Sequence, residues 1–341
     1  MPHVLLLGAG FSRNWGGWLA DEAFEYLLGH PRIDDGLRTL LWKHRREGGG
    51  FEAALNELQT ETVEHFTTPL LDQATRLGEA IRGMFADMNT AFAERGTFNF
   101  VLTGPGNSVN DFLAQFDAIF TLNQDLLVEH LYLADHLSML LQPKDWYMPG
   151  MEPTTEPPTT AIRDVKEWRP MDPADLSKFT VDRNRQPFFK LHGSSNWIDR
   201  SGTRPMLVIG GNKPSAIARH PILRWNHEQF REYLSKPATR LMVIGYSFRD
   251  AHINDAIGSA VDRGSLKLFI IDPDGVDVLD KDYRWTLFWP DSTVRGPLFN
   301  RLQDHLIGAS RRSLRETFGE DLVEHRKVMK FFLESSERVG E

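Results

Sequence analysis

The feature that most constrains the fold is a series of short, continuously apolar runs, most of them followed by glycine or a polar residue. Runs of this kind, without polar alternation, are typical of strands buried on both faces of a parallel sheet. Helical patterns separate them, most clearly at Ala20–Leu28 and Asp250–Val261. The alternation predicts an α/β fold with a Rossmann-like, doubly wound parallel sheet. The predicted strands are His3–Leu7, Ala118–Thr121, Phe188–Leu191, Met206–Ile209, Leu241–Ile244 and Leu266–Ile271.

Two insertions and a tail complete the predicted organisation. Residues 1–290 are expected to form one α/β domain, interrupted at about 28–115 by a helical insertion that covers the sheet. A proline-rich stretch at about 143–186 is expected to be a surface loop. Residues 291–341 are expected to form a helical tail, in which 297–337 has the pattern of one or two amphipathic helices.

Composition excludes several classes of function. With 341 residues and 41% apolar side chains, the chain can bury a substantial core. Its net charge of -8 argues against direct nucleic-acid binding, which usually requires a basic surface. The absence of cysteine excludes disulfides, thiolate nucleophiles and cysteine-based zinc sites. No apolar run approaches the roughly 20 residues of a membrane span, and no signal peptide is evident, so a soluble, cytoplasmic protein is expected.

The first predicted strand runs into a glycine-rich turn, VLLLGAGFS. Gly8 and Gly10 would allow the backbone to approach a ligand closely, and backbone N–H groups at such a turn can hold a phosphate. The dinucleotide-binding pattern requires a third glycine, and Arg13 stands in its place. The turn alone therefore leaves a tight connection without any ligand equally open.

Polar side chains follow the next two strands. Asn123 and Asp125 come just after Ala118–Thr121 and would project to the same side of an extended segment, although capping of a helix at Leu126–Leu133 also explains them. His192 ends the strand Phe188–Leu191, where the following Gly193, Ser194 and Ser195 are predicted to form a loop. This histidine is either a core residue or a group that transfers protons.

Two further turns follow the later strands. Gly245, Tyr246 and Ser247 form a glycine-hydroxyl turn, after which Asp250 is a candidate helix N-cap and His252 is expected to be structural. Asp272 follows the last predicted strand, where an acidic side chain can bind ribose hydroxyls. A turn aspartate without a ligand is the equal alternative.

In combination and order, these motifs resemble the sirtuin family. The segments that match its patterns are Gly8-Ala9-Gly10-Phe11-Ser12 followed by Gly16, Thr121-Leu122-Asn123-Gln124-Asp125, His192-Gly193 and Gly245-Tyr246-Ser247. The matches span residues 3–275. The chain departs from the deacylase sirtuins in reading Gly17-Trp18-Leu19-Ala20-Asp21 where they carry P-D-F-R, and in lacking the cysteines of their zinc ribbon. Lys190–Trp197 and Ile244–Asn254 resemble the sirtuin-like NAD hydrolases of bacterial antiphage defence.

The resemblance implies that NAD is the substrate and binds across the strand ends. Its diphosphate would lie on Gly8–Ser12 and its nicotinamide ribose near His192, with further contacts from Thr121, Gly245, Tyr246, Ser247 and Asp272. His192 would act as a base, Asn123 would hold the attacking water and Asp125 would bind the carboxamide. No metal is expected, because the chain has no metal-ligand spacing such as HExxH.

Two other functions and several partners remain open at this stage. A protein deacylase or ADP-ribosyl transferase would require a groove beside His192 for a second substrate, and a noncatalytic module could sense NAD or ADP-ribose with the same turns. Defence proteins of this type are implied to form homo-oligomers and to act with a HerA-type hexameric ATPase or, less often, a short Argonaute. The helical insertion and an apolar stripe in the tail are candidate docking surfaces, unless the stripe packs on its own core. The stripe comprises Leu314, Phe318, Leu322 and His325.

Overall fold

The computed structural model describes most of the chain. The described residues are 1–100, 108–133, 145–154, 167–172, 179–182, 184–202, 205–210, 213–264, 266–280 and 295–333. The predicted domain boundary at residue 290 and about half of the predicted loop at 143–186 lie outside these ranges. The described residues of that loop include three short strands, Asp145–Tyr147, Met151–Pro153 and Trp168–Pro170, so the prediction of a plain surface loop is wrong there, because pairing with other strands orders these segments.

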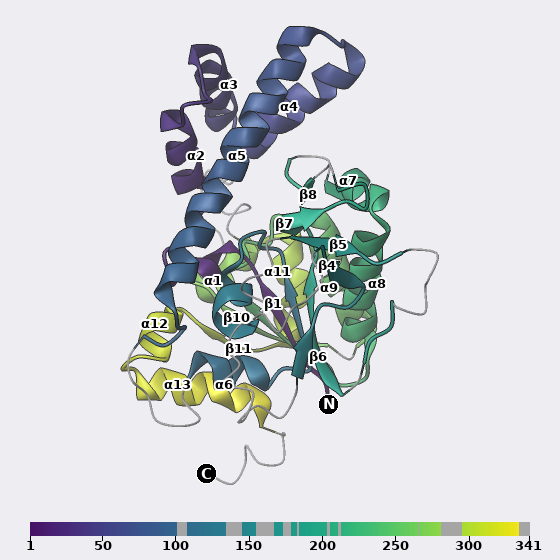
Figure 1. Cartoon of the computed structure of the whole chain (residues 1–341). Helices are drawn as coiled ribbons and strands as arrows, with labels where there is room; N and C mark the ends of the chain where they lie inside the picture. The colour runs from purple at the N-terminus through teal and green to yellow at the C-terminus, as the bar shows by residue number, and fades with distance from the viewer. Residues whose placement is uncertain are drawn as a thin grey trace.

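The core is a seven-stranded parallel sheet in the order β11-β10-β9-β1-β2-β6-β3 (Figure 1). Helices flank both faces, so the predicted Rossmann-like α/β fold is confirmed. β2, β3 and β6 lie on one side of β1, and the later strands β9, β10 and β11 lie on the other. Doubly wound folds bind ligands at the point where the strand order reverses in this way. The strands are β1 (His3–Leu7), β2 (Ala118–Thr121), β3 (Asp145–Tyr147), β6 (Arg185–Lys190), β9 (Arg240–Ile244), β10 (Lys267–Ile271) and β11 (Leu306–Ser310).

The apolar run of β1 explains why it occupies the centre of the sheet. Val4 and Leu6 pack into the core on one face, and Leu5 and Leu7 pack into the core on the other. The first face is covered by α8 (Pro221–Ser235), α9 (Ala251–Asp262) and α11 (Pro297–Leu302). The opposite face is covered by α6 (Val109–Ala114), α12 (Leu314–Thr317) and α13 (Leu322–Met329), together with the base of the helical insertion.

A second sheet of four short strands adjoins the carboxyl end of β6. Its order is β4 (Met151–Pro153), β5 (Trp168–Pro170), β7 (Gly193–Ile198) and β8 (Pro205–Leu207). The predicted strand Met206–Ile209 therefore belongs to this sheet and not to the parallel one. The loop predicted after His192 is also wrong, because the chain turns sharply at Gly193 (φ +74°) and continues directly as β7.

The described residues of the predicted insertion are mostly helical, with short connecting segments. The insertion begins at the end of α2 (Ala20–Gly29) and contains α3 (Asp35–Arg46), α4 (Gly50–Glu64), α5 (Thr68–Arg95) and α6. Figure 1 shows α3, α4 and the outer half of α5 projecting away from the sheet, so they do not lie flat across it. The inner half of α5 reaches down beside α1 (Ala9–Arg13). None of the helices in the described ranges has the length and apolarity needed to cross a membrane.

The tail contains a strand that the helical pattern did not predict. β11 pairs in parallel with β10 and extends the sheet by one strand, because its backbone can continue the hydrogen-bond ladder of β10. The predicted stripe is also divided between two helices. Leu314 and Phe318 are buried in the core, whereas Leu322 is exposed at the start of α13. The first half of the stripe thus packs on its own core.

Candidate active site

The strand registers bring the predicted site residues to one edge of the sheet. Leu7 of β1 pairs with Thr121 of β2, and Thr121 pairs in turn with Lys190 of β6. On the other side, Leu7 pairs with Ile244 of β9, and Ile244 pairs with Ile271 of β10. The turns that follow these strands therefore lie side by side. They carry Gly8–Ser12, Asn123, Asp125, His192, Gly245–Ser247 and Asp272.

Three glycines allow the first and fourth turns to touch through their backbones. The N–H groups of Gly8 and Gly10 donate to the carbonyl oxygens of Ile244 and Gly245, each at 2.9 Å. A Cβ atom on Gly10 would lie 2.7 Å from the Gly245 Cα, which is too close for any side chain. The glycines thus have a structural role besides any role in ligand approach. A diphosphate at this turn would need N–H donors other than those of Gly8 and Gly10.

Ser12, Asn123 and Asp125 form a hydrogen-bonded group that we call the amide-carboxylate cluster. The Ser12 hydroxyl donates to Asp125 Oδ2 at 2.9 Å, and Asn123 Nδ2 donates to Ser12 Oγ and to the Gly8 carbonyl oxygen, each at 3.0 Å. Thr121 Oγ1 accepts from the Asn123 backbone N–H at 3.0 Å. Asp125 Oδ1 also accepts from the Leu127 N–H, so the side chain caps the following turn as well. Asn123 and Asp125 therefore contact the Gly8–Ser12 turn, as a shared site requires. The alternative that they cap the following helix is correct for Asp125.

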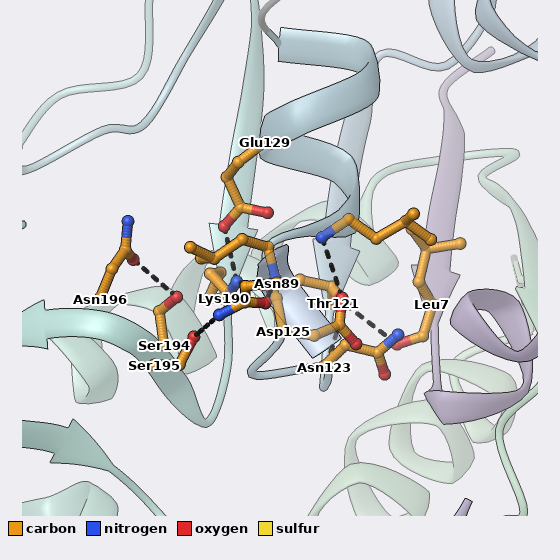
Figure 2. Close-up of polar contacts among 12 residues, drawn as sticks. Leu7, Asn89, Thr121, Asn123, Asp125, Glu129, Lys190, Ser194, Ser195 and Asn196 are labelled. Carbon is orange, nitrogen blue, oxygen red and sulfur yellow. Dashed lines mark hydrogen bonds and ion pairs between the residues drawn. The ribbon is translucent and has the colours of Figure 1, made fainter. Parts of the chain in front are cut away.

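A buried ion pair lies next to this cluster (Figure 2). Lys190 Nζ donates to Glu129 Oε1 and to the Asp125 backbone oxygen, each at 2.6 Å. Both charged side chains are buried, and burial raises the pKa of Glu129 while the charge of Lys190 opposes that rise. The prediction of site residues omitted this pair. The signal that could have revealed it is a lysine inside an otherwise apolar strand.

Asn89 connects the helical insertion to the same edge. From α5, its Nδ2 donates to Ser195 Oγ at 2.9 Å and its Oδ1 accepts from the Leu126 N–H at 2.8 Å (Figure 2). The side chain thus holds the segment after Asp125 against β7. Nothing in the sequence around Asn89 indicates this role, because the contact depends on where α5 crosses the core.

His192 lies in a second group, the histidine cluster, with His227 of α8 and His252 of α9. His192 Nε2 lies 3.1 Å from His252 Nε2, and the ring centroids of His227 and His252 are 5.2 Å apart. The Nε2 of His227 donates to the Leu191 carbonyl oxygen at 2.9 Å. The expectation that His252 is structural did not include this contact with His192, and His227 was not predicted at all.

Burial keeps the histidine cluster uncharged. It lowers the pKa of His192 well below the usual value, with help from the charge of Lys213 and from the other two histidines. Burial also lowers the pKa of His227 to about 3 and lowers that of His252. Each ring is therefore neutral at pH 7 and carries one N–H donor and one nitrogen lone pair.

A glutamine links the two clusters. Gln124 lies between Asn123 and Asp125, and its Nε2 donates to the His192 carbonyl oxygen at 3.2 Å and to the Val208 oxygen at 2.7 Å. The Ser195 backbone N–H donates to the backbone carbonyl oxygen of Gln124 at 2.8 Å. The backbone of His192 is thereby held at a set position relative to the amide-carboxylate cluster.

The other predicted site residues, Tyr246, Ser247 and Asp272, differ in their burial and in their hydrogen bonds. Tyr246 is buried and its hydroxyl donates to Asn254 Oδ1 at 3.0 Å, whereas Ser247 is exposed. Asp272 Oδ1 accepts from the Asp274 N–H at 2.9 Å, as the turn alternative requires.

Asp250 is the N-cap residue of α9, as predicted, but its side chain makes no capping bond. Its Oδ1 instead accepts from Lys213 Nζ at 2.9 Å, and Lys213 also pairs with Glu52 of α4 at 3.3 Å. The helical insertion thus reaches this edge at a second point.

Comparison with known proteins identifies the family of the chain. The family model of the SIR2-like domain matches residues 117–289, which is just over half of the chain. The match contains Asn123, Asp125 and His192, and it begins after the Gly8–Ser12 turn. A search of curated proteins finds no match. The matched region and the site it contains show that the chain belongs to the family of SIR2-like domain proteins.

Proposed function

We propose that the protein is an NAD hydrolase that cleaves NAD to nicotinamide and ADP-ribose. SIR2-like domains use NAD, which supports the choice of substrate. The observation that carries the proposal is the position of a neutral, buried histidine just after β6, the strand next to the one that the amide-carboxylate cluster follows. In this arrangement the amide-carboxylate cluster can bind the nicotinamide ribose, and the histidine can accept a proton.

The reaction breaks the bond between the nicotinamide nitrogen and C1′ of the ribose, and a water oxygen forms the new bond to C1′. Nicotinamide leaves as a neutral group, so a base is needed more than an acid. Asn123 Nδ2 is already committed to Gly8 and Ser12, so the side chain would hold the water through Oδ1. The Asp125 carboxylate has further lone pairs and would accept from the carboxamide N–H₂ group.

His192 would take the proton from the water or from a ribose hydroxyl. In the contact between His192 and His252, one ring must donate and the other must accept, since both are neutral. When His192 donates through Nε2, its Nδ1 lone pair becomes the free base. His252 therefore acts in this proposal as the acceptor that holds His192 in its basic tautomer.

Hydrolysis is favoured over protein deacylation because the chain has no cysteine with which to build a zinc ribbon. The segment after His192 forms β7 and pairs with β8 instead. The same turns would also suit a noncatalytic sensor of NAD or ADP-ribose, and only turnover distinguishes that function from the proposed one.

The test is to incubate the purified chain with NAD and to measure free nicotinamide, with and without an acetylated peptide. Release of nicotinamide and ADP-ribose without the peptide is the expected result. Release that depends on the peptide would identify a deacylase. Saturable NAD binding without any product would identify a sensor and would contradict the proposed hydrolase.

We further propose that the enzyme is the NAD-depleting effector of an antiphage defence system and acts as a homo-oligomer with a HerA-type ATPase, or alternatively with a short Argonaute. The resemblance of Lys190–Trp197 and Ile244–Asn254 to such hydrolases supports this role. The net charge of -8 is suited to a division in which the partner contacts nucleic acid. Light scattering after size-exclusion chromatography, with and without the protein encoded next to it, tests the assembly. A fully active monomer that no such protein affects would contradict it.

A further inference from the structure

We propose that His192, His227 and His252 form a binding site for a divalent transition-metal ion of the Zn²⁺ class, and that occupancy of this site switches the enzyme off. The site itself depends only on the three side chains. The inhibitory effect rests on the proposed NAD hydrolase function. In this proposal the metal is a regulator, and turnover does not require it.

The distances within the histidine cluster are close to those of a metal site. One ring nitrogen of each histidine lies within 4.8 Å of the others, and the two Nε2 atoms of His192 and His252 are 3.1 Å apart. Two imidazoles bound tetrahedrally to Zn²⁺ hold their ligating nitrogens about 3.3 Å apart, given Zn–N bonds of about 2.0–2.1 Å. Small side-chain rotations therefore suffice to close the site around an ion.

The surroundings of the three rings also suit a metal site. His192 and His227 are buried, and the backbone carbonyl of Leu191 accepts from His227 Nε2. A carbonyl that holds one ring N–H is a usual outer partner of a metal-binding histidine. His252 is only partly buried and lies in the first turn of α9, so it provides a path for an ion from solvent.

The surrounding charges permit a cation. Lys213 and Arg231 are the positive groups whose charge acts on these histidines. Asp250 and Asp255 act on His252 with the opposite sign, and Glu52 neutralises Lys213 together with Asp250. Three carboxylates thus balance two cations. Three imidazoles favour zinc, copper and nickel over magnesium or calcium, which prefer oxygen ligands.

An ion in this site would occupy the lone pairs on which the proposed chemistry depends. His192 could not accept a proton while it ligates a metal, and His252 could not hold it in the basic tautomer. Loss of a positioned general base costs about 100- to 10,000-fold in rate. We therefore expect saturating Zn²⁺ to lower NAD hydrolysis by about 100-fold or more, and a chelator to restore it.

Binding is tested first, without reference to activity. The full chain is stripped with a chelator and titrated with Zn²⁺ against a chromophoric competitor, and Co²⁺ is used as a spectroscopic probe of coordination. One equivalent should bind, with a tetrahedral Co²⁺ spectrum, and Mg²⁺ should not compete. Because the chain contains no cysteine, thiolates cannot account for the signal, but its 12 histidines make a control necessary.

The matched variants are His252→Ala, His227→Gln and His65→Ala. Loss of a direct ligand should weaken Zn²⁺ by more than the 10- to 100-fold typical of an outer partner. Glutamine at position 227 can still donate to Leu191, and circular dichroism checks that each variant folds. His65 is exposed on the insertion, so His65→Ala should bind Zn²⁺ like the wild type. Wild-type affinity in folded His252→Ala, or no stoichiometric binding by the wild type, would overturn the site.

Inhibition is tested second, with each variant compared to its own rate without zinc. The wild type and His65→Ala should lose activity in Zn²⁺ and regain it with chelator, whereas His252→Ala should be insensitive. Stoichiometric Zn²⁺ at these histidines without a change in a measurable rate would overturn the switch. If the chain shows no NAD hydrolysis at all, the proposed function fails, while the binding result still decides the site.

Discussion

The amide-carboxylate cluster and the histidine cluster occupy the same edge of the sheet but are built in different ways. In the first, Ser12, Asn123 and Asp125 bond to one another and to backbone groups. In the second, ring-to-ring contact and burial predominate, and only the Nε2 of His227 is held by a backbone oxygen within the part of the chain that the structure describes. The first cluster is therefore suited to hold a substrate in one position, and the second to accept a proton or an ion.

This difference has an energetic cause. Hydrogen bonds to the cluster's own backbone fix a side chain and leave it little freedom. Neutral imidazoles in a buried site keep one lone pair each and avoid the cost of a buried charge. The two clusters should therefore respond differently to substitution, and the expected effects range from a large loss of turnover to a small loss of stability.

The largest effect should come from His192→Ala, which removes the proposed base. NAD hydrolysis should fall about 100- to 10,000-fold, as is typical for a positioned general base, while NAD binding changes little. Nicotinamide release and calorimetric NAD binding measure the two effects. Asn123→Ala should abolish turnover as well, since it removes the oxygen proposed to hold the water. Near-native turnover in folded His192→Ala protein would return the residue to a structural role.

Lys190→Met should destabilise the fold by about 3–5 kcal/mol, because it leaves Glu129 buried without its partner. Chemical denaturation measures the change in the free energy of unfolding. The control is Lys43→Met, which removes an exposed pair with Glu57 and should change stability little.

A second variant sharpens this test. Lys190→Met combined with Glu129→Leu should recover most of the stability, since an apolar pair can replace a buried ion pair. Activity should remain low, because the backbone of Asp125 still lacks the Lys190 bond. Full recovery of activity in the double variant would show that this bond does not position Asp125.

The histidine cluster should make stability depend on pH. The pKa of His227 is about 3 in the folded protein, against the ordinary value of 6.5 when unfolded. Below pH 6.5 the unfolded chain binds a proton that the folded chain does not, so stability is full above 6.5 and falls as the pH decreases. From pH 8 to pH 5.5 this group should cost about 1.4 kcal/mol.

Urea unfolding of the wild type and of His227→Gln at both pH values measures this contribution. The variant should lose that much less stability on acidification, whereas His65→Gln, at an exposed position, should behave like the wild type. Equal pH dependence in the wild type and in His227→Gln would mean that His227 titrates alike in the folded and unfolded chains.

The smallest effect is expected at Asn89, which ties the helical insertion to the first cluster. Asn89→Ala leaves the Leu126 N–H without its acceptor and should cost about 1 kcal/mol in stability, because Leu126 is only partly buried. Thr90→Ala on the same helix is the control, since Thr90 is exposed. A KM for NAD that rises with little change in kcat would indicate that Asn89 positions the binding segment.

Much of this edge could be predicted because its signals are local. β1 and β2 begin and end at the predicted residues, since each is a buried apolar run that a turn terminates. The position of His192 at the end of β6 followed from the same pattern. β7 was missed because GSSNWI has a polar composition typical of a loop, and its pairing with β5 and β8 makes it a strand. β11 was missed because its partner, β10, lies more than 30 residues earlier in the chain.

The sequence by itself determined the parallel sheet and the order of its polar turns, and it singled out Asn123, Asp125 and His192 as candidate site residues, since short-range pattern and motif specify all of these. The tertiary structure decided which distant side chains meet. It brought His227 and His252 to His192 from two different helices, placed Asn89 against Leu126 and buried Lys190 with Glu129. These contacts depend on how helices pack on the sheet, and packing joins residues whose separation along the chain carries no periodic signal.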